Sequence, residues 1–317
     1  MKKIIITLSL LIIGFTSYSQ EHLKLLKYYK VAFHIVRTSA GTTNITGLEL
    51  DIQKAIKYMN DKFIGANIQF YICGINSINY IDNDTYFNIS GDLSSITGAM
   101  APYRIENAIN VFLFNSMVDD LWGFSSTPDE GTIAVRHEVI QGQLVTVTHE
   151  FGHFFWLSHT HSGGNEFVTR GESANCTTAG DGFCDTPADP NLEFETYVDE
   201  NCDYTGTMVD ARGDTYDPDV TLIMSYARHK CRTRFSQEQL ARMNLIATQG
   251  AWIVYSHMQY FENTAITTDY DIEEDVILIK NTKIENNAEV RLKPCAFVEI
   301  SGDSEVKLGS TLDITIE

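Results

Sequence analysis

The residues best suited to chemistry in this chain lie between His149 and His159. His149 and His153 are four residues apart, which places two side chains on one face of a helix, about one turn from each other. Two imidazoles in this arrangement can bind one Zn²⁺ at ~2.0–2.1 Å. Glu150 follows the first histidine, where its carboxylate can take a proton from a metal-bound water. We therefore predict a catalytic zinc site with His159 as the third ligand.

The position of His159 constrains the path of the chain after the helix. Six more helical residues beyond His153 would carry His159 ~9 Å along the helix axis. We therefore expect the chain to turn soon after His153 and to bring His159 back. A His-Glu-x-x-His sequence by itself also occurs on ordinary helix surfaces, so the prediction depends on His159 and on a matching segment downstream.

Composition narrows the class of protein. The chain has 317 residues, and its 44% hydrophobic and 11% aromatic content favours a globular fold over disorder. The net charge of −19 argues against nucleic acid or an anionic membrane surface as a partner, because both reward clustered Lys and Arg. Residues 1–19 have the charged start and short apolar run of a secretory signal peptide. We expect a secreted or periplasmic protein without a membrane span, and the oligomeric state is left open.

Six cysteines fit an oxidising compartment. None has Cys-x-x-Cys spacing, so we do not expect a thiolate zinc cluster. Four lie in the region after the zinc motif, where we expect two disulfides in any of three pairings. The six are Cys73, Cys176, Cys184, Cys202, Cys231 and Cys295.

Strands and a helix precede the motif in an order that indicates the fold. The patterns predict strands at 28–37, 68–75, 109–115 and 132–135, and helices at 47–63, from 143 into the motif, and at 236–251. This order predicts an α+β fold with an α/β-type mixed sheet and two backing helices. We place this catalytic domain at residues 20–262.

The segment at 163–220 is long, polar and weak in periodicity. Residues 181–219 hold twelve Asp or Glu and one basic residue, Arg212. Residues 181–187 offer carboxylates, carbonyls and a hydroxyl close together in the sequence, as Ca²⁺ prefers. Residues 210–219 are a second, weaker candidate for a cation. A solvated acidic loop without an ion is the alternative for both.

Residues 263–317 form a different kind of sequence. Apolar residues recur every eight positions, and Gly, Ser or Asn fall between them. We predict a small all-β module, such as a few coils of a solenoid, with a simple meander packed on the catalytic domain as the alternative. Stabilisation, adhesion and substrate docking are its candidate roles. The repeated positions are Val276, Ile284, Leu292, Ile300, Leu308 and Ile316.

Two motifs together carry a family resemblance. The His149-to-His159 pattern, with Met224-Ser225-Tyr226 downstream, resembles the metzincin metallopeptidases, and the pappalysin-like branch with its bacterial secreted members is the more similar. The resemblance covers roughly residues 31–251. The features specific to this branch are Gly152 within the motif, the Gly180–Pro187 segment, Cys231 seven residues after Met224, and the helix start at Phe235-Ser236.

The resemblance implies a secreted zinc endopeptidase that hydrolyses protein substrates. In such an enzyme His149, His153 and His159 bind Zn²⁺, and Glu150 is the general base. Met224 forms a turn beneath the metal. Tyr226 either ligates the resting zinc or donates to the tetrahedral oxyanion.

The resemblance further implies calcium and a disulfide pattern. Calcium is expected near Asp181, Thr186 and the carbonyl of Phe183. The disulfides are expected to cross, as Cys176–Cys202 and Cys184–Cys231.

Trp156 departs from the family pattern, which has Gly seven residues after the first histidine. Gly at this position adopts a positive φ, which ends the helix. A bulky residue in the same left-handed conformation costs ~1–2 kcal/mol. Either the turn is built differently, or His159 is less well placed and His161 is a substitute ligand. This departure motivates an alternative function, a catalytically impaired metzincin-like domain that binds protein or glycan.

Overall fold

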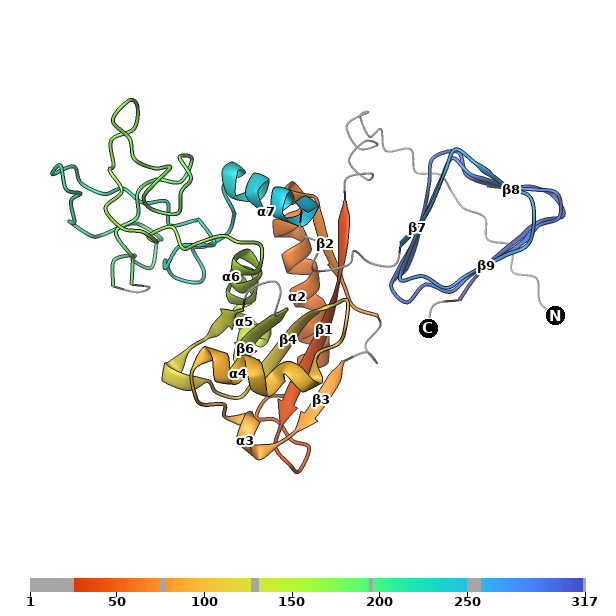
Figure 1. Cartoon of the computed structure of the whole chain (residues 1–317), viewed down its shortest axis with the longest axis horizontal. Coiled ribbons are helices and arrows are strands. Elements are labelled where there is room, and N and C mark those ends of the chain that lie inside the picture. Colours follow the sequence, from red (N-terminus) through yellow and green to blue (C-terminus); the bar gives the residue numbers. More distant parts are fainter. Residues whose placement is uncertain (1–25, 74–77, 127–130, 194–195, 250–257, 316–317) are drawn as a thin grey trace.

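The computed structural model describes residues 26–73, 78–126, 131–193, 196–249 and 258–315 (Figure 1). The predicted signal peptide and Ile316 lie outside the described residues. Over the ranges that are described, no helix combines the length and the apolar character needed to cross a membrane.

A mixed six-stranded sheet forms the centre of the N-terminal part of the described chain. The eleven-residue strand β1 (Lys27–Arg37) pairs in parallel with three strands. On one side, the first half of β1 pairs with β2 and its second half pairs with β3. On the other side, β1 pairs with β4. β5 pairs antiparallel with β6 at one edge. The other strands are β2 (Ile68–Tyr71), β3 (Asn79–Asp82), β4 (Ile109–Phe114), β5 (Gly123–Ser125) and β6 (Thr132–Arg136).

Helices cover both faces of this sheet, as a mainly parallel sheet requires. On one face, α2 (Leu48–Phe63) and α6 (Leu144–Phe154) pack into the main hydrophobic core. On the other face, α4 (Leu93–Met100) contributes Ile96 and Met100 to a second cluster. The predicted α+β fold with two backing helices is confirmed. The remaining helices are α3 (Asp84–Phe87), α5 (His137–Gly142), α7 (Gln237–Gln249) and the 3₁₀ turns Ile64–Ala66, Ala101–Tyr103 and Val118–Asp120.

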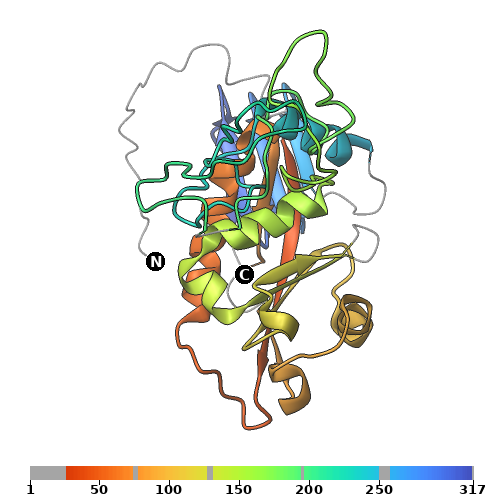
Figure 2. The same cartoon turned by 90° about the vertical axis from the view of Figure 1, so that its left-hand side faces the viewer.

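The segment between α6 and α7 has no helix and no strand longer than an isolated bridge within its described residues. It occupies one end of the long axis in Figure 1 and faces the viewer in Figure 2. Two disulfides hold it, as predicted. The predicted crossed pairing is wrong, because the bridges are Cys176–Cys184 and Cys202–Cys231.

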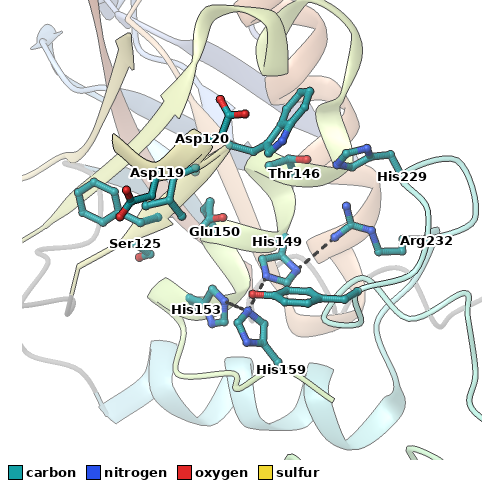
Figure 3. A pocket seen from close by; sticks show the side chains of 15 residues that line it. Asp119, Asp120, Ser125, Thr146, His149, Glu150, His153, His159, His229 and Arg232 are labelled. Carbon is teal, nitrogen blue, oxygen red and sulfur yellow. Dashed lines mark hydrogen bonds between the residues drawn. The ribbon is translucent and has the colours of Figure 1, made fainter. Parts of the chain in front are cut away.

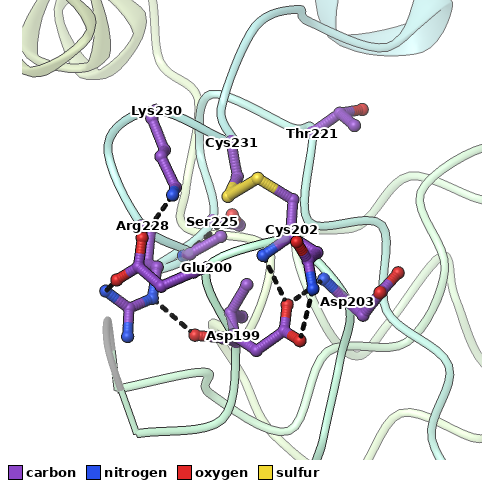
Figure 4. Close-up of a disulfide and its surroundings, with 12 residues drawn as sticks. Asp199, Glu200, Cys202, Asp203, Thr221, Ser225, Arg228, Lys230 and Cys231 are labelled. Atoms are coloured by element: carbon purple, nitrogen blue, oxygen red, sulfur yellow. Dashed lines mark hydrogen bonds and ion pairs between the residues drawn. A yellow bond between two sulfur atoms is a disulfide. The ribbon is translucent and has the colours of Figure 1, made fainter.

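Local turns explain the pairing of Cys202 with Cys231. Val198 and Tyr204 form an antiparallel bridge, so the chain between them folds back sharply. The Asp199 carboxylate accepts the backbone N–H groups of residues 201 and 203 and closes this turn (Figure 4). The turn presents Cys202 to Cys231 in a small apolar cluster, while Cys176 closes a local loop of its own with Cys184.

The C-terminal part is a three-sided coil of parallel strands, which appears as a triangle in Figure 1. Each side is a three-stranded sheet, in the orders β13-β10-β7, β14-β11-β8 and β15-β12-β9. Because every described pair in it is parallel, the coil is a short solenoid and not a meander. Its strands are β7 (Met258–Glu262), β8 (Ala265–Ile266), β9 (Tyr270–Ile272), β10 (Val276–Lys280), β11 (Lys283–Ile284), β12 (Glu289–Leu292), β13 (Phe297–Ser301), β14 (Glu305–Val306) and β15 (Thr311–Ile314).

The eight-residue repeat corresponds to the sides of this coil. Val276, Ile284 and Leu292 lie on β10, β11 and β12, which are successive sides. All three side chains are buried, so one step of the repeat carries the chain around one corner. β7 also belongs to the coil, which therefore includes five residues, 258–262, that precede the predicted start of the module at 263.

A disulfide and a small apolar cluster attach the coil to the sheet. Cys73, just after β2, is bonded to Cys295 of the coil. The Tyr71 hydroxyl donates to Asp275 at 2.8 Å, and the rings of Tyr28 and Phe297 meet edge to face at 5.4 Å. The coil is therefore fixed beside β1 and β2, at the opposite end of the molecule from the segment between α6 and α7 (Figure 1).

Candidate active site

The helix α6 ends directly after the second histidine of the motif. The N–H of Trp156 donates to the carbonyl of His153 at 2.8 Å, and the N–H of Leu157 donates to the carbonyl of Gly152 at 3.0 Å. Trp156 has a φ of 64°. These two bonds and the left-handed residue make a Schellman cap, a helix ending in which this position is usually Gly. The turn expected after His153 is therefore present, with Trp156 in the conformation that favours glycine.

This cap brings His159 back to the helix. The Nε2 atom of His159 lies 2.9 Å from Nε2 of His153 and 3.1 Å from Nε2 of His149. The Trp156 side chain is 56% exposed, so the indole is not packed tightly against the rest of the protein. The strain at this residue is therefore in the backbone. His161 is outside the group of three and stacks on the ring of His159 at 5.0 Å.

Hydrogen bonds at Nδ1 fix the tautomers of His149 and His153. Nδ1 of His149 donates to the carbonyl of Ile223 at 2.8 Å, and Nδ1 of His153 donates to the carbonyl of Leu157 at 2.8 Å. Burial is the main cause that lowers the pKa of both rings, and it lowers the pKa of His159 to about 3. The rings are therefore neutral, and the Nε2 lone pairs of His149 and His153 point to a shared space.

Three convergent nitrogen lone pairs repel one another unless a cation lies between them. Tetrahedral zinc with nitrogen ligands at 2.0–2.1 Å would separate those nitrogens by about 3.3 Å, close to the 2.9 Å and 3.1 Å observed between the Nε2 atoms. Three histidines also match the donor set of an open catalytic zinc site. The residues present therefore fit Zn²⁺.

The turn at Met224 lies against the middle of α6. A Cβ atom on Gly152 would lie 2.5 Å from the Met224 sulfur, so only glycine allows this contact. The N–H of Thr160 donates to the Met224 carbonyl at 3.1 Å, and the preceding carbonyl, of Ile223, accepts from His149. The turn thereby connects the first histidine with the segment that carries the third.

Glu150 is buried between α6 and the edge strand β5. A Cβ atom on Gly123 would lie 2.9 Å from both Cγ and Oε1 of Glu150, so the backbone of β5 passes directly over the carboxylate. Burial raises the pKa of Glu150 to about 8, and the positive charge of Arg232 acts in the opposite direction. The carboxyl group can therefore exchange a proton near neutral pH.

Tyr226 lies beside the third histidine. Its ring centre is 4.5 Å from that of His159 and 4.6 Å from that of His161. Burial, followed by the charge of Glu150, raises the pKa of the Tyr226 phenol. The phenol therefore keeps its proton and can donate it to an oxygen atom in the cleft.

A cavity of about 520 Å³ adjoins the histidines. It is also lined by the edge strand β5 and the residues before it, and by Thr146, His229 and Arg232 (Figure 3). Thr146, His229 and Arg232 were not predicted from the sequence, because they stand in no motif. Thr146 is far from the other two along the chain, so only the fold reveals that they share one cavity.

The residues expected to bind calcium lie together in the segment after α6. The Thr186 hydroxyl donates to Oδ1 of Asp181 at 2.8 Å and lies 3.0 Å from the Phe183 carbonyl oxygen. The buried Glu166 is adjacent, since a Cβ on Gly180 would lie 2.1 Å from its Oε2. Burial raises the pKa of Asp181 and raises that of Glu166 to about 7. Arg170 forms an ion pair with Glu166 at 2.8 Å, and the Gln239 amide donates to Asp181 at 3.1 Å, so protein groups offset part of the cost of burying these carboxylates.

The weaker acidic candidate, residues 210–219, is occupied by protein hydrogen bonds. Asp210 accepts the backbone N–H groups of Arg212 and Asp214, both from the same turn. Asp219 forms an ion pair with Arg234. These two carboxylates therefore have structural roles.

Comparison with known proteins finds two kinds of similarity, to a peptidase family model and to solved structures. Residues 108–247 match the peptidase M43 family, described as "Pregnancy-associated plasma protein-A". Mirolysin in complex with compound 9 aligns at a TM-score of 0.50 and 16% identity, over 71% of this chain and 93% of that chain. Mature mirolysin of Tannerella forsythia in complex with a cleaved peptide also aligns at 0.50 and 16%, over 72% and 94%. These structures share the fold, and a search of curated proteins finds no match.

Proposed function

We propose that the chain is a zinc-dependent metalloendopeptidase of the pappalysin-like metzincins, in which His149, His153 and His159 hold the zinc and Glu150 is the general base. The observation that carries this assignment is the convergence of the three Nε2 atoms, at 2.9 Å and 3.1 Å. When bound, Zn²⁺ supplies Lewis acidity to the scissile carbonyl and to water.

The protein groups around the metal divide the work of peptide hydrolysis. Glu150 accepts the proton of the attacking water at its carboxylate and then delivers it to the leaving amine nitrogen. The Tyr226 phenol donates a hydrogen bond to the oxyanion that develops on the carbonyl oxygen. Met224 takes no part in the chemistry. The turn that contains it positions His149, because Nδ1 of His149 donates to the carbonyl of Ile223.

The substrate is proposed to bind as an extended strand beside β5. In the described sheet, β5 is the last strand of the path β2-β1-β4-β6-β5, so one side of it can pair with a peptide. Gly123 and Ser125 of this strand line the cavity that holds Glu150. Mature mirolysin, which shares the fold, has been solved with a cleaved peptide.

We also propose export and a structural calcium ion. The disulfides support an oxidising compartment outside the cytosol, and residues 1–19 have the pattern of a signal peptide. Asp181, Phe183 through its carbonyl, and Thr186 are the proposed calcium ligands. Added Ca²⁺ should raise the melting temperature of the wild type and not that of Asp181→Asn.

Replacing Glu150 by glutamine tests the assignment of the general base. Glu150→Gln should retain stoichiometric zinc while cleavage of casein or gelatin falls by about 10²–10⁴-fold. Glu138→Gln is the matched control, because Glu138 is an exposed carboxylate on α5 that pairs with Arg136. Zinc retained together with undiminished cleavage in Glu150→Gln would overturn the assignment.

The alternative of an impaired binding domain was motivated by Trp156. The Schellman cap removes that motive, because Trp156 takes the left-handed conformation and His159 reaches the other histidines. Metal analysis of the purified protein separates the two functions. Absence of stoichiometric zinc, together with chelator-insensitive binding to protein or glycan, would favour the binding domain.

A further inference from the structure

Three aromatic rings pack against one another beside the zinc site, those of His159, His161 and Tyr226. The ring centres of His159 and His161 are 5.0 Å apart, and their planes differ by only 12°, so the two imidazoles are stacked. The Tyr226 ring lies 4.5 Å from the first and 4.6 Å from the second, and it is inclined to them by 56° and 57°. Each ring is therefore in contact with the other two.

The third zinc ligand is oriented differently from the other two. Nδ1 of His149 and Nδ1 of His153 each donate to a backbone carbonyl at 2.8 Å, which fixes the planes of those rings. Within the described chain, the hydrogen bonds of the His159 side chain are both at Nε2, toward the other two ligands (Figure 3). The plane of the His159 ring is therefore held by its packing against neighbouring rings.

The backbone between the two stacked histidines is anchored at Thr160. Its N–H donates to the carbonyl of Met224 at 3.1 Å, and its hydroxyl donates to the buried carboxylate of Asp189. His159 and His161 flank this residue, so the backbone that carries their stacked rings is fixed to the turn at Met224 on one side and to Asp189 on the other. The contact between the two imidazoles is thus built into the fold and does not depend on a mobile side chain reaching across the cleft.

His161 also separates the ring cluster from a second cavity. This cavity has a volume of about 310 Å³, and His161 lines it whereas His159 and Tyr226 do not. Without the imidazole of His161, the cavity would extend to the other two rings. Both would then lose the contacts that this side chain makes with them and would gain room to rotate.

We propose that His161 is a positioning residue of the zinc site, which orients the ring of His159 toward the metal and holds the Tyr226 phenol beside it. This proposal rests on the proposed zinc site and peptidase function, and it assigns a role to a side chain outside the group of three histidines that converge on the metal. Partners that orient a metal ligand typically contribute tenfold to a hundredfold to metal affinity or activity.

Metal binding by two variants tests the orientation of His159. In competition with a chelator, His161→Ala should bind Zn²⁺ on the order of tenfold to a hundredfold more weakly than the wild type. His161→Phe retains a ring that can stack, and its affinity should stay close to that of the wild type. Co²⁺ reports the geometry of its ligands in its absorption spectrum, so the Co²⁺-loaded His161→Ala protein should have altered bands and the His161→Phe protein should not. A zinc affinity that falls equally in both variants would overturn the proposal, because a nitrogen of His161 would then be needed.

His34→Ala is a matched control for the loss of a stacked histidine. The ring of His34 stacks on that of Phe112 with the same interplanar angle of 12°, at 4.3 Å, in the core of the sheet and away from the catalytic cavity. This variant should have a lower melting temperature than the wild type, with zinc affinity and the Co²⁺ spectrum unchanged. If His161→Ala behaved in the same way, its role would be structural only and the proposal would be wrong.

Kinetics at saturating zinc test the effect on Tyr226. His161→Ala should lower kcat by about tenfold or more with little change in KM, because a displaced phenol is lost mainly from the transition state. Tyr226→Phe should then cost less in the His161→Ala background than in the wild type, since part of the contribution of the hydroxyl is already lost. Independent effects of the two substitutions would overturn the proposed link to Tyr226.

The same measurements separate this proposal from the peptidase assignment. Equal zinc affinities and equal spectra of the wild type and His161→Ala, with cleavage intact, would overturn the role of His161 alone. A wild type whose zinc affinity depends on His161 but which cleaves nothing would overturn the peptidase function alone. A wild type that binds no zinc would overturn the three-histidine site and this proposal with it.

Discussion

Replacing Trp156 by alanine and by glycine isolates the strain at the end of the zinc helix. Both changes remove the indole, so its remaining contacts cancel in the comparison. At a φ of 64°, a Cβ atom costs roughly 1–2 kcal/mol. The greater freedom of glycine in the unfolded chain returns ~0.4–1 kcal/mol of that difference. The free energy of unfolding should therefore be ~0.5–1 kcal/mol higher for Trp156→Gly than for Trp156→Ala.

The same pair of substitutions at Lys57 provides a control with the opposite sign. Lys57 is an exposed residue in the middle of α2, where glycine costs ~1 kcal/mol relative to alanine. Urea unfolding is measured for all four variants after chelation, and then again with zinc. An alanine variant at position 156 that is as stable as, or more stable than, the glycine variant would refute the reasoning.

Three further predictions concern close contacts and the metal. Gly152→Ala should be less stable than Gly98→Ala in urea unfolding. The new Cβ at position 152 would contact the sulfur of Met224, whereas the Cβ at position 98 would contact nothing within 4 Å. Overpacking costs ~1–3 kcal/mol, whereas alanine in an open helical position gains ~0.5–1 kcal/mol. Gly123→Ala should displace the carboxylate of Glu150 and lower kcat by about tenfold or more, with zinc content unchanged by metal analysis; unchanged kcat would contradict this contact. Chelation should abolish cleavage and lower the melting temperature, and added zinc should restore both. The reason is that a ligand bound only by the folded state stabilises that state. A melting temperature that the chelator does not change would argue against the three-histidine site.

Local sequence was sufficient to predict the elements that carry the site. The spacing of His149 and His153 is a property of a single helix, and the strong apolar strands around it leave few ways to build the sheet. The eight-residue repeat likewise predicted the solenoid, because each step takes the chain along one side and around one corner. The repeat positions are buried at Val276, Ile284 and Leu292, whereas Ile300 and Leu308 are exposed. These signals are local, so they can be read before any long-range contact is known.

Tertiary contacts decided the features that depend on residues far apart in the chain. The disulfide partners of Cys202 and Cys184 follow from how the turns of the long segment fold, which spacing alone does not determine. The tolerance of Trp156 depends on the exposure of its side chain and on the two backbone bonds of the cap. No periodicity encodes either feature.

The contrast is sharpest in the catalytic cavity. The histidines and Glu150 could be identified from the sequence because a metal requires particular donor atoms at a spacing that one helix and one turn can provide. Thr146 and Arg232 line one cavity because the turn at Met224 packs against α6, and a hydroxyl or a guanidinium in isolation has no pattern that marks it. The metal site could therefore be predicted from the sequence, whereas the other residues that line the cavity were brought together by packing.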